Sequence, residues 1–442
     1  MNIVFFSIVL VSFIFAGGHQ LFGSGFAPGA LPMQVLSKAI IDSAKSAVDL
    51  SIGLIGVMTL FLGLMKVAEA GGLLSVISRL LRPLMVRLFP DVPPDHPAMG
   101  AMILNMSANV LGLGNAATPF GIRAMQELDR LNPHKGCATN AMALFLAINT
   151  SSLTLLPTGV IALRAAAGSS NPAGILPTTL FATLCSTLVA VIAAKTYQRF
   201  STVPGGVSIP ERAMEKEAEK KIEGDLPISD DPAGNMDEMG MEPGYPLWVS
   251  ILALVCLASL VPLTVIWGDR VSPWIIPGLM LLFLAYGVIR KVRIYEVFVD
   301  GAKEGFQVAV RIIPFLVAIL VAVGMFRASG ALDAMVMVLG KWTAKVGLPA
   351  EALPMALLRP LSGSGAFGIL ASIINNPSIG PDSYTGYLVS TLQGSTETTF
   401  YVIAVYYGAV SIRRVRHTLA AALTADFAGV VFSVIACAWF LS

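Results

Sequence analysis

Charged side chains are scarce in this chain: Asp, Glu, Lys and Arg make up 13% of its 442 residues, while 55% are hydrophobic. Soluble domains carry about 25% charged residues, so this chain lacks roughly half of the polar surface that water requires. The composition excludes a single water-soluble globule, a disordered chain, a fibrous repeat and a disulfide scaffold. The class that remains is an all-α polytopic membrane protein.

Motifs of common membrane enzymes and pumps are also absent. The chain has no GxxxxGK[ST] motif, so nucleotide hydrolysis is not expected to drive it, and it has neither HExxH nor GxSxG. Its four cysteines show no CxxC or zinc spacing, its four histidines are not clustered, and no basic patch is interleaved with aromatics. We therefore expect no enzymatic activity, no cofactor, no metal site and no nucleic-acid partner.

Long apolar runs, in contrast, are abundant. A helix needs about 20 apolar residues to cross the hydrocarbon core. The first run, Asn2–Ala16, is shorter and lacks a basic flank, so we interpret it as an uncleaved span and not as a signal peptide. Eight further runs are predicted to span the membrane: Ala47–Met65, Cys137–Pro157, Ile175–Ala194, Leu247–Ile266, Trp274–Ile289, Val308–Phe326, Gly386–Gly408 and Leu419–Leu441.

Two more apolar stretches, Pro97–Gly114 and Ala352–Ile374, are interrupted by Asn, Gly, Ser and Pro. The positive-inside rule places dense basic clusters in the cytoplasm. All clusters fall on one side only if each interrupted stretch is a re-entrant hairpin, one entering from the cytoplasm and one from outside. The prediction is about nine transmembrane helices plus two re-entrant hairpins, with the N-terminus inside and the C-terminus outside a bacterial cytoplasmic (inner) membrane. The clusters are Arg79/Arg82/Arg87, Lys195/Arg199, Arg290/Lys291/Arg293 and Arg413/Arg414/Arg416.

The acidic residues are concentrated in one segment. Residues 201–245 hold eleven acidic residues against four basic ones, with Pro, Gly and Met between them. This composition is typical of a linker. We therefore divide the chain into an N-terminal span with a periplasmic loop (1–36), a first repeat (37–200), an acidic cytoplasmic linker (201–245) and a second repeat (246–442).

The two predicted repeats share short sequence matches. "DSAKSA" from Asp42 matches "DGAKEG" from Asp300 at an offset of 258, and the same offset aligns "EAGGLL" with "RASGAL". With the orientation above, the two copies lie in opposite senses in the membrane. Inverted repeats whose broken helices meet near the midplane are typical of transporters.

Polar side chains gather inside the interrupted stretches. Irregular backbone at membrane depth must face protein or a watery cavity, so these residues either glue helices together or line a solute site. We predict a solute site, because the density is high at two matched places. The candidate residues are Asn105, Ser107, Asn109 and Asn115 in the first stretch and Ser362 and Ser364 in the second.

A second matched pair of polar runs, "NTSSLTLLPTG" and "QGSTETTF", interrupts two of the predicted spans. Each run indicates an unwound helix whose half-helix ends could bind a polar solute or an ion. Glu397 stands out, because a carboxylate within a span is a functional hypothesis by default; it either couples an ion or forms a charge pair with Arg359. The other candidate residues are Asn149, Ser151 and Ser152 in the first run and Gln393, Ser395 and Thr396 in the second.

Around these residues the chain resembles the spore maturation proteins A and B joined into one polypeptide. The segment from Leu104 to Pro133 ("LNMSANVLGLGNAATPFGIRAMQELDRLNP") is similar to the A protein, and "RPLSGSGAFGI" with "GPDSYTGYLVSTLQGSTETTF" is similar to the B protein. The resemblance covers roughly 40–200 and 245–442. It implies membership of the nucleoside-recognition or "gate" proteins, which are similar to concentrative nucleoside transporters and to the membrane domain of ferrous-iron transporters. It transfers no site residues.

The leading functional hypothesis is a secondary transporter of a small polar, nucleoside-like solute, coupled to a proton or sodium gradient. A non-transporting ligand-recognition or scaffold protein of envelope or spore maturation is the first alternative, and a channel is the second. The expected partners are the solute, the coupling ion, the lipid bilayer and further copies of the chain.

Overall fold

We analysed a computed structural model, which describes residues 2–22, 31–112, 114–151, 153–201 and 244–441. The described part is helical and contains no strand, apart from one isolated bridge between Cys137 and Arg414. The all-α prediction is confirmed. The elements of the first half are α1 (Asn2–Phe22), α2 (Pro32–Ala70), α3 (Leu73–Leu88), α4 (Pro97–Val110), α5 (Gly114–Arg130), α6 (Asn140–Thr150), α7 (Thr158–Ala166), η1 (Pro172–Ile175) and α8 (Leu176–Tyr197).

The second half repeats this order. Two of its capped helices, α15 and α16, begin where the side chain of a serine, Ser362 or Ser383, accepts a backbone N–H of the first turn, as N-cap residues do. Its elements are α11 (Leu247–Ile289), α12 (Ile294–Ala328), α13 (Ala331–Thr343), η3 (Ala344–Val346), η4 (Ala350–Ala352), α14 (Leu353–Leu358), α15 (Gly363–Ile374), α16 (Tyr384–Ser395), α17 (Thr399–Gly408) and α18 (Thr418–Phe440).

The long helices α2 and α12 form a seam between the halves. They pack side by side in opposite directions over most of their length. Lys66 lies over Gly301 near one end, Thr59 lies against Gly305, and Ser43 lies over Gly324 near the other end. Small residues at such positions let two helix backbones approach closely.

The contacts of this α2–α12 seam are reciprocal. The offset of 258 converts Ser43 into Gly301 and Lys66 into Gly324, so it exchanges one seam contact with the other. This exchange is what a two-fold relationship between the halves produces. The offset also relates Gly72 and Gly330, which end the turns after α2 and α12 with left-handed φ angles of 85° and 79°, where glycine is favoured. The seam contacts therefore relate the two halves by a two-fold exchange, and that the halves lie inverted in the membrane stays a prediction.

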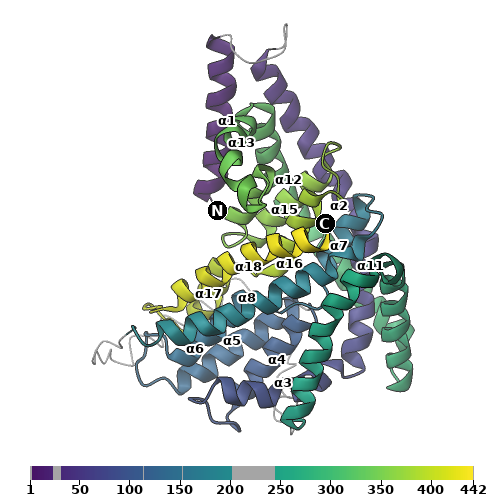
Figure 1. The fold of residues 1–442 in the computed structure, drawn as a ribbon, viewed down its shortest axis with the longest axis vertical. Coiled ribbons are helices and arrows are strands. Elements are labelled where there is room, and N and C mark those ends of the chain that lie inside the picture. Colours follow the sequence, from purple (N-terminus) through teal and green to yellow (C-terminus); the bar gives the residue numbers. More distant parts are fainter. Residues whose placement is uncertain (1, 23–30, 113, 152, 202–243, 442) are drawn as a thin grey trace.

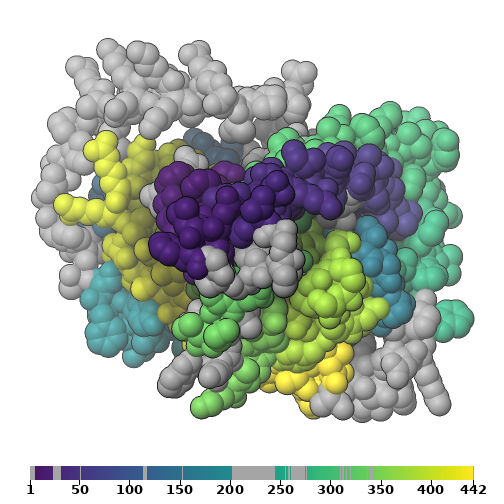
Figure 2. Space-filling view, turned by 90° about the horizontal axis from the view of Figure 1, so that it is seen from above, coloured from purple at the N-terminus to yellow at the C-terminus, as the bar shows by residue number. Residues whose placement is uncertain are grey.

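Helices α8 and α18, which are equivalent in the two halves, lie side by side across the middle of the molecule (Figure 1). On one side of them lie α4, α5 and α6, and on the other lie α1 and α13. Viewed from above, the N-terminal residues in purple lie across the middle of the face (Figure 2).

Two predicted spans, Leu247–Ile266 and Trp274–Ile289, fall within the single helix α11. Near its start, Ser250 Oγ donates to the carbonyl oxygen of Leu80 (2.6 Å); just after its end, Arg290 Nε donates to that of Gly71 (2.7 Å). A straight helix would separate residues 250 and 290 by about 60 Å, far more than nine residues of chain can bridge. The helix therefore doubles back between these residues, as two spans require.

Four helices of the described residues are long and apolar enough to cross a membrane: Phe5–Phe22, Pro32–Ala70, Pro172–Tyr197 and Thr418–Phe440. The sequence predicted nine crossings. For two of the five spans that differ the reason is physical: Gly386–Gly408 consists of the two short helices α16 and α17, and Cys137–Pro157 contains α6 and the break after it. No helix in either span reaches the required length. The count of nine stays a prediction.

The interrupted stretches correspond to two helix pairs, α4 with α5 and α14 with α15. The interruption lies at the turn only, because α4 runs without a break through its polar residues Asn105 and Ser107. The second arm of the first pair, α5, is amphipathic and extends to Arg130, beyond the predicted end at Gly114. That each pair enters and leaves the membrane on one side remains a prediction of the charge pattern.

Candidate functional site

Two helices of the structure are discontinuous, one in each half. The first consists of α6 and α7, separated by residues 151–157, and the second consists of α16 and α17, separated by Thr396, Glu397 and Thr398. Thr396 and Thr398 have extended backbones. Each break leaves the carbonyls of one helix end and the N–H groups of the next without helical partners.

The two breaks meet. The backbone N–H of Glu397 donates to the carbonyl oxygen of Thr150, the last residue of α6, at 2.7 Å. The next carbonyl along the chain, that of Ser151, accepts a hydrogen bond from Thr187 Oγ1 of α8 at 2.6 Å. We call this place, where residues 150–151 and 153–157 meet residues 395–399, the crossing.

The first helix pair reaches the crossing through amide side chains. Asn109 Nδ2 of α4 donates to Asn149 Oδ1 of α6 (2.9 Å), and Asn149 Nδ2 donates to the carbonyl oxygen of Phe145 (2.9 Å). The backbone N–H of Leu155 donates to the carbonyl oxygen of Val110 (2.9 Å), so the end of α4 is attached to the first break.

The second helix pair reaches the crossing through Arg359, which is 5% exposed. Its guanidinium donates to the carbonyl oxygens of Gln393 (Nε, 3.2 Å) and Thr396 and to Thr398 Oγ1 (3.1 Å). The C-terminal end of a helix carries partial negative charge, so Arg359 neutralises the end of α16. The predicted charge pair with Glu397 is present, but its N···O distance is 3.8 Å.

Glu397 therefore keeps much of its carboxylate free. Its side chain is 48% exposed, in contrast to the buried threonines on either side of it. Asp426 of α18 lies at the same break, and its Oδ2 accepts from Thr399 Oγ1 at 2.6 Å. Its Oδ1 is buried and has no partner among the described residues, so the crossing holds two carboxylates and one guanidinium.

Several of the remaining candidate residues form hydrogen bonds within their own helix, and Asn105 forms hydrogen bonds to other elements. Ser107, Ser151 and Ser395 are buried, and their hydroxyls donate to carbonyls of their own helices. Ser362 is the N-cap of α15. These hydroxyls stabilise the helix pieces, and their role in binding a solute stays a prediction. Asn105, fully buried, donates to the carbonyl oxygen of Ala117 (2.7 Å) and to the Tyr406 hydroxyl (3.2 Å), while its Oδ1 is unpartnered among the described atoms.

Gln393 and Ser364 are only half-buried, and Gln393 Oε1 has no hydrogen-bond partner within the described chain. The side chain of Asn115 and the whole of Ser152 lie outside the described residues. The structure thus brings Asn109, Asn149, Arg359 and the 393–397 run together at the crossing. The roles predicted for them in binding and coupling stay predictions.

Arg164 in α7 was not among the residues predicted from the sequence, although a single arginine within the apolar run Val160–Ala167 is a signal for it. Its side chain is fully buried and stacks over the Tyr387 ring, with 4.2 Å from Cζ to the ring centroid. It donates to the carbonyl oxygen of Pro381 (2.6 Å) and pairs with Asp382 (3.0 Å). Arg164 therefore attaches α7 to the loop before α16 and so joins the first half of the chain to the second.

The Asp382 carboxylate makes this attachment dependent on pH. Partial burial disfavours its charged form, but hydrogen bonds from the Ser169 hydroxyl and from the N–H and hydroxyl of Ser170, together with Arg164, outweigh burial and hold its pKa below the ordinary carboxyl value. A depressed pKa stabilises the fold above the unfolded-state pKa, and the stabilisation is lost as the pH falls through the folded-state pKa.

We expect Asp382→Asn to lower the free energy of unfolding by at most about 1 kcal/mol at neutral pH, since the carboxylate is exposed enough for solvent to screen it. The thermal midpoints of the two proteins should converge below about pH 4, where the wild-type carboxyl becomes protonated. A scan of midpoint against pH in detergent measures this. A gap that stays constant down to low pH would contradict the assignment.

Comparisons with known proteins fit both halves of this arrangement. The family model described as "Gate: Nucleoside recognition" matches residues 51–167 and 309–413, which include both broken helices. Spore maturation protein A of Bacillus subtilis (strain 168) is 44% identical over 192 residues, which are 43% of this chain and 92% of that protein. Spore maturation protein B of the same organism is 48% identical over 163 residues, 37% of this chain and 88% of that protein. No solved structure matches the chain.

Proposed function

The chain belongs to the nucleoside-recognition (Gate) family, and we propose that it is a secondary membrane carrier of a small polar, nucleoside-like solute, driven by a proton or sodium gradient. The observation that carries the proposal is the crossing, where the two broken helices meet through the hydrogen bond from Glu397 N–H to the Thr150 carbonyl. Broken helices at membrane depth occur where they are buried in protein or line a watery cavity, and transporters bind substrates and ions at such breaks.

The side chains at the crossing suit a solute with both hydroxyl and amide groups. Such a solute needs acceptors for its hydroxyls and both donors and acceptors for a heterocycle. The half-free carboxylate of Glu397 and the unpartnered Gln393 Oε1 provide acceptors, and Asn109 adds an amide. Because Arg359 is occupied by backbone carbonyls, Glu397 is available for a hydroxyl or a coupling ion.

The test is uptake into proteoliposomes that contain the full chain, across a panel of labelled nucleosides. The double variant Glu397→Gln, Asn109→Ala should reduce the initial rate at least about tenfold, because each lost hydrogen bond to a charged or buried partner costs about 1 to 3 kcal/mol. Glu296→Gln, which changes an exposed glutamate at the start of α12, is the matched control and should leave uptake intact. Unchanged uptake in the double variant would count against this site.

Counterflow separates a carrier from a channel. A carrier preloaded with unlabelled solute accumulates label transiently, and its rate saturates with solute concentration, whereas a polar pore does neither. The proposed location is the bacterial inner membrane, with the N-terminus in the cytoplasm. Self-association of the chain is a further expectation that size measurements in detergent can check.

A second candidate is a non-transporting membrane protein of envelope or spore maturation, which the names of the two relatives favour, since each relative matches one half of the chain. Under that proposal the acidic linker would dock a partner. Its residues 211–242 lie outside the described residues. Deleting them should abolish function as a scaffold and leave uptake largely intact in a carrier.

A further inference from the structure

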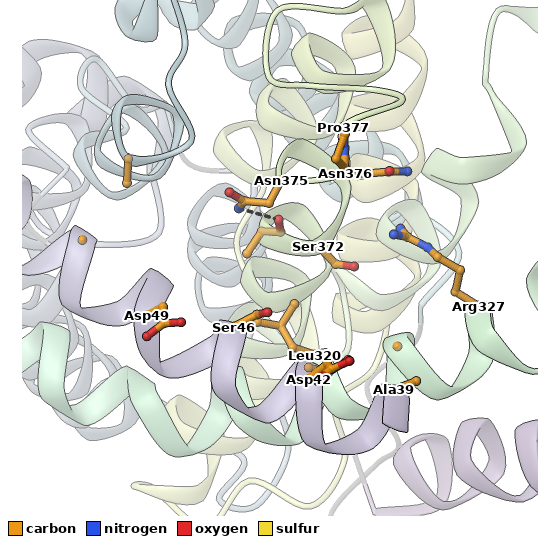
Figure 3. Close-up of a pocket in the computed structure, with 15 residues that line it drawn as sticks. Ala39, Asp42, Ser46, Asp49, Leu320, Arg327, Ser372, Asn375, Asn376 and Pro377 are labelled. Atoms are coloured by element: carbon orange, nitrogen blue, oxygen red, sulfur yellow. Dashed lines mark hydrogen bonds between the residues drawn. The ribbon is translucent and has the colours of Figure 1, made fainter. Parts of the chain in front are cut away.

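A polar cavity of about 490 Å³ opens between α2, α12 and the end of α15 (Figure 3). This volume falls within the range of small-molecule pockets, about 300 to 1,000 Å³. Its lining includes Asp42, Asp49, Arg327, Asn375 and Asn376 and contains no residue of the crossing. We call it the α2–α15 cavity.

Two carboxylates face this cavity without a basic partner. Asp42, Ser46 and Asp49 follow one another along α2 at spacings of four and three residues, which place them on one face of a helix; Figure 3 shows them along one wall. Neither aspartate forms an ion pair with any described residue, and both are exposed. Two like charges on one wall favour an occupant of opposite charge.

The opposite wall is formed by the end of α15, whose C-terminal carbonyls add partial negative charge. Asn375 Nδ2 is used within the helix, where it donates to the carbonyl oxygen of Ala371 at 2.8 Å. Arg327 of α12 lies at one end of the cavity (Figure 3). It makes no ion pair within the described chain, although Asp333 attracts it electrostatically.

The inverted repeat shows what fills the equivalent place in the other half. The offset of 258 relates Asp42 to Asp300, Ser46 to Glu304, Lys66 to Gly324, Glu69 to Arg327 and Lys45 to Lys303. There, Lys66 Nζ lies 3.3 Å from Glu304 and 3.4 Å from Glu69, and Lys303 pairs with Asp300 at 2.9 Å. At the cavity end of the seam, Gly324 stands where the other end has Lys66, and Arg327 stands where the other end has Glu69. This end therefore lacks one ammonium group and has a guanidinium in place of a carboxylate.

We propose that the α2–α15 cavity binds a zwitterion, a molecule in which a primary ammonium group is joined by a short chain to an acidic group. The ammonium lies between Asp42 and Asp49, in the half where Gly324 stands in place of a lysine. The acidic group meets Arg327, whose planar fork of donors matches a carboxylate or a phosphate. Two sources carry this chemistry, a free amino-acid-like solute and the headgroup of a phosphatidylethanolamine lipid.

The test uses the full chain purified in an uncharged detergent and titrated by calorimetry with β-alanine, phosphoethanolamine and ethanolamine. Binding of either zwitterion is expected, and Asp42→Asn, Asp49→Asn should weaken it at least about tenfold, because a charge-assisted hydrogen bond is worth about 1.5 to 3 kcal/mol. Arg327→Gln should weaken the zwitterions and leave ethanolamine unaffected. Asp300→Asn, the equivalent of Asp42 in the other half, is the matched control and should change nothing.

Nanodiscs separate the two sources. If only the lipid binds, native mass spectrometry of protein from mixed nanodiscs should show phosphatidylethanolamine retained over phosphatidylglycerol by the wild type and lost by the double aspartate variant. Absence of binding by all soluble probes together with no lipid preference would overturn the proposal. So would a wild-type affinity that the double aspartate variant leaves unchanged.

Discussion

Replacing Arg164 with glutamine should lower the free energy of unfolding by about 3 to 5 kcal/mol, because its fully buried guanidinium serves several acceptors and each buried acceptor that loses its partner costs about 1 to 3 kcal/mol. The guanidinium joins α7 to the Pro381 carbonyl and to Asp382, and it also donates to Ser390 Oγ (3.3 Å) and to the Asn171 carbonyl (3.3 Å). All of these acceptors lose their donor at once, and a glutamine is too short to reach both sides.

The thermal midpoint in detergent measures this loss, with Arg414→Met as the control because Arg414 is exposed; exposed substitutions usually change stability by less than about 0.5 kcal/mol. Arg164→Lys should recover only part of the loss, since a lysine donates from a single point and cannot bridge several acceptors. If Arg164→Gln costs no more than Asp382→Asn, the arginine does not attach the halves to each other.

Replacing Arg359 with methionine should have an effect of similar size and, in addition, should abolish uptake. Methionine keeps most of the volume but leaves the carbonyls of Gln393 and Thr396 and the Thr398 hydroxyl without their donor. A buried acceptor that loses its partner costs about 1 to 3 kcal/mol. The break after Ser395 then loses the bonds from Arg359 and keeps the backbone hydrogen bond from Glu397 N–H to the Thr150 carbonyl.

Two measurements separate the contributions to this effect. The thermal midpoint reports the packing, and uptake by protein that remains folded at the assay temperature reports the site. Glu397→Gln, which removes the 3.8 Å charge pair but keeps Arg359 on its carbonyls, should impair uptake with little change in the midpoint. If Arg359→Met leaves both the midpoint and uptake unchanged, the guanidinium does not organise the crossing.

Much of the fold could be predicted from local patterns. The matches at Asp42 and Asp300 predicted a repeat, and the left-handed glycines Gly72 and Gly330 and the reciprocal seam contacts follow the same offset. The polar runs predicted both helix breaks, because Ser, Thr and Asn compete for backbone hydrogen bonds. Arg359 and Glu397 were paired correctly, since each is a rare charge in an apolar setting.

Other parts of the site could not be predicted, because they depend on contacts between distant segments. Asn105 and Tyr406 are 301 positions apart in the chain, and no spacing rule connects them. The hydroxyls of Ser107, Ser151 and Ser395 were predicted to bind solute, yet local geometry directs each of them to a carbonyl of its own helix. Which polar side chain faces a cavity is decided by packing, which the sequence pattern does not contain.

The α2–α12 seam has a mechanical consequence. A slide of α12 along α2 by one turn would move Ser43 from Gly324 to Leu320 or Ala328, both larger than glycine, and would move Lys66 off Gly301 at the same time. Because closely packed surfaces have few alternative registers, the pair acts as an axis of fixed length. We therefore expect the broken helices and the helix pairs α4–α5 and α14–α15 to rotate around this axis when the crossing opens to either side of the membrane. Helices α2 and α12 would keep their register.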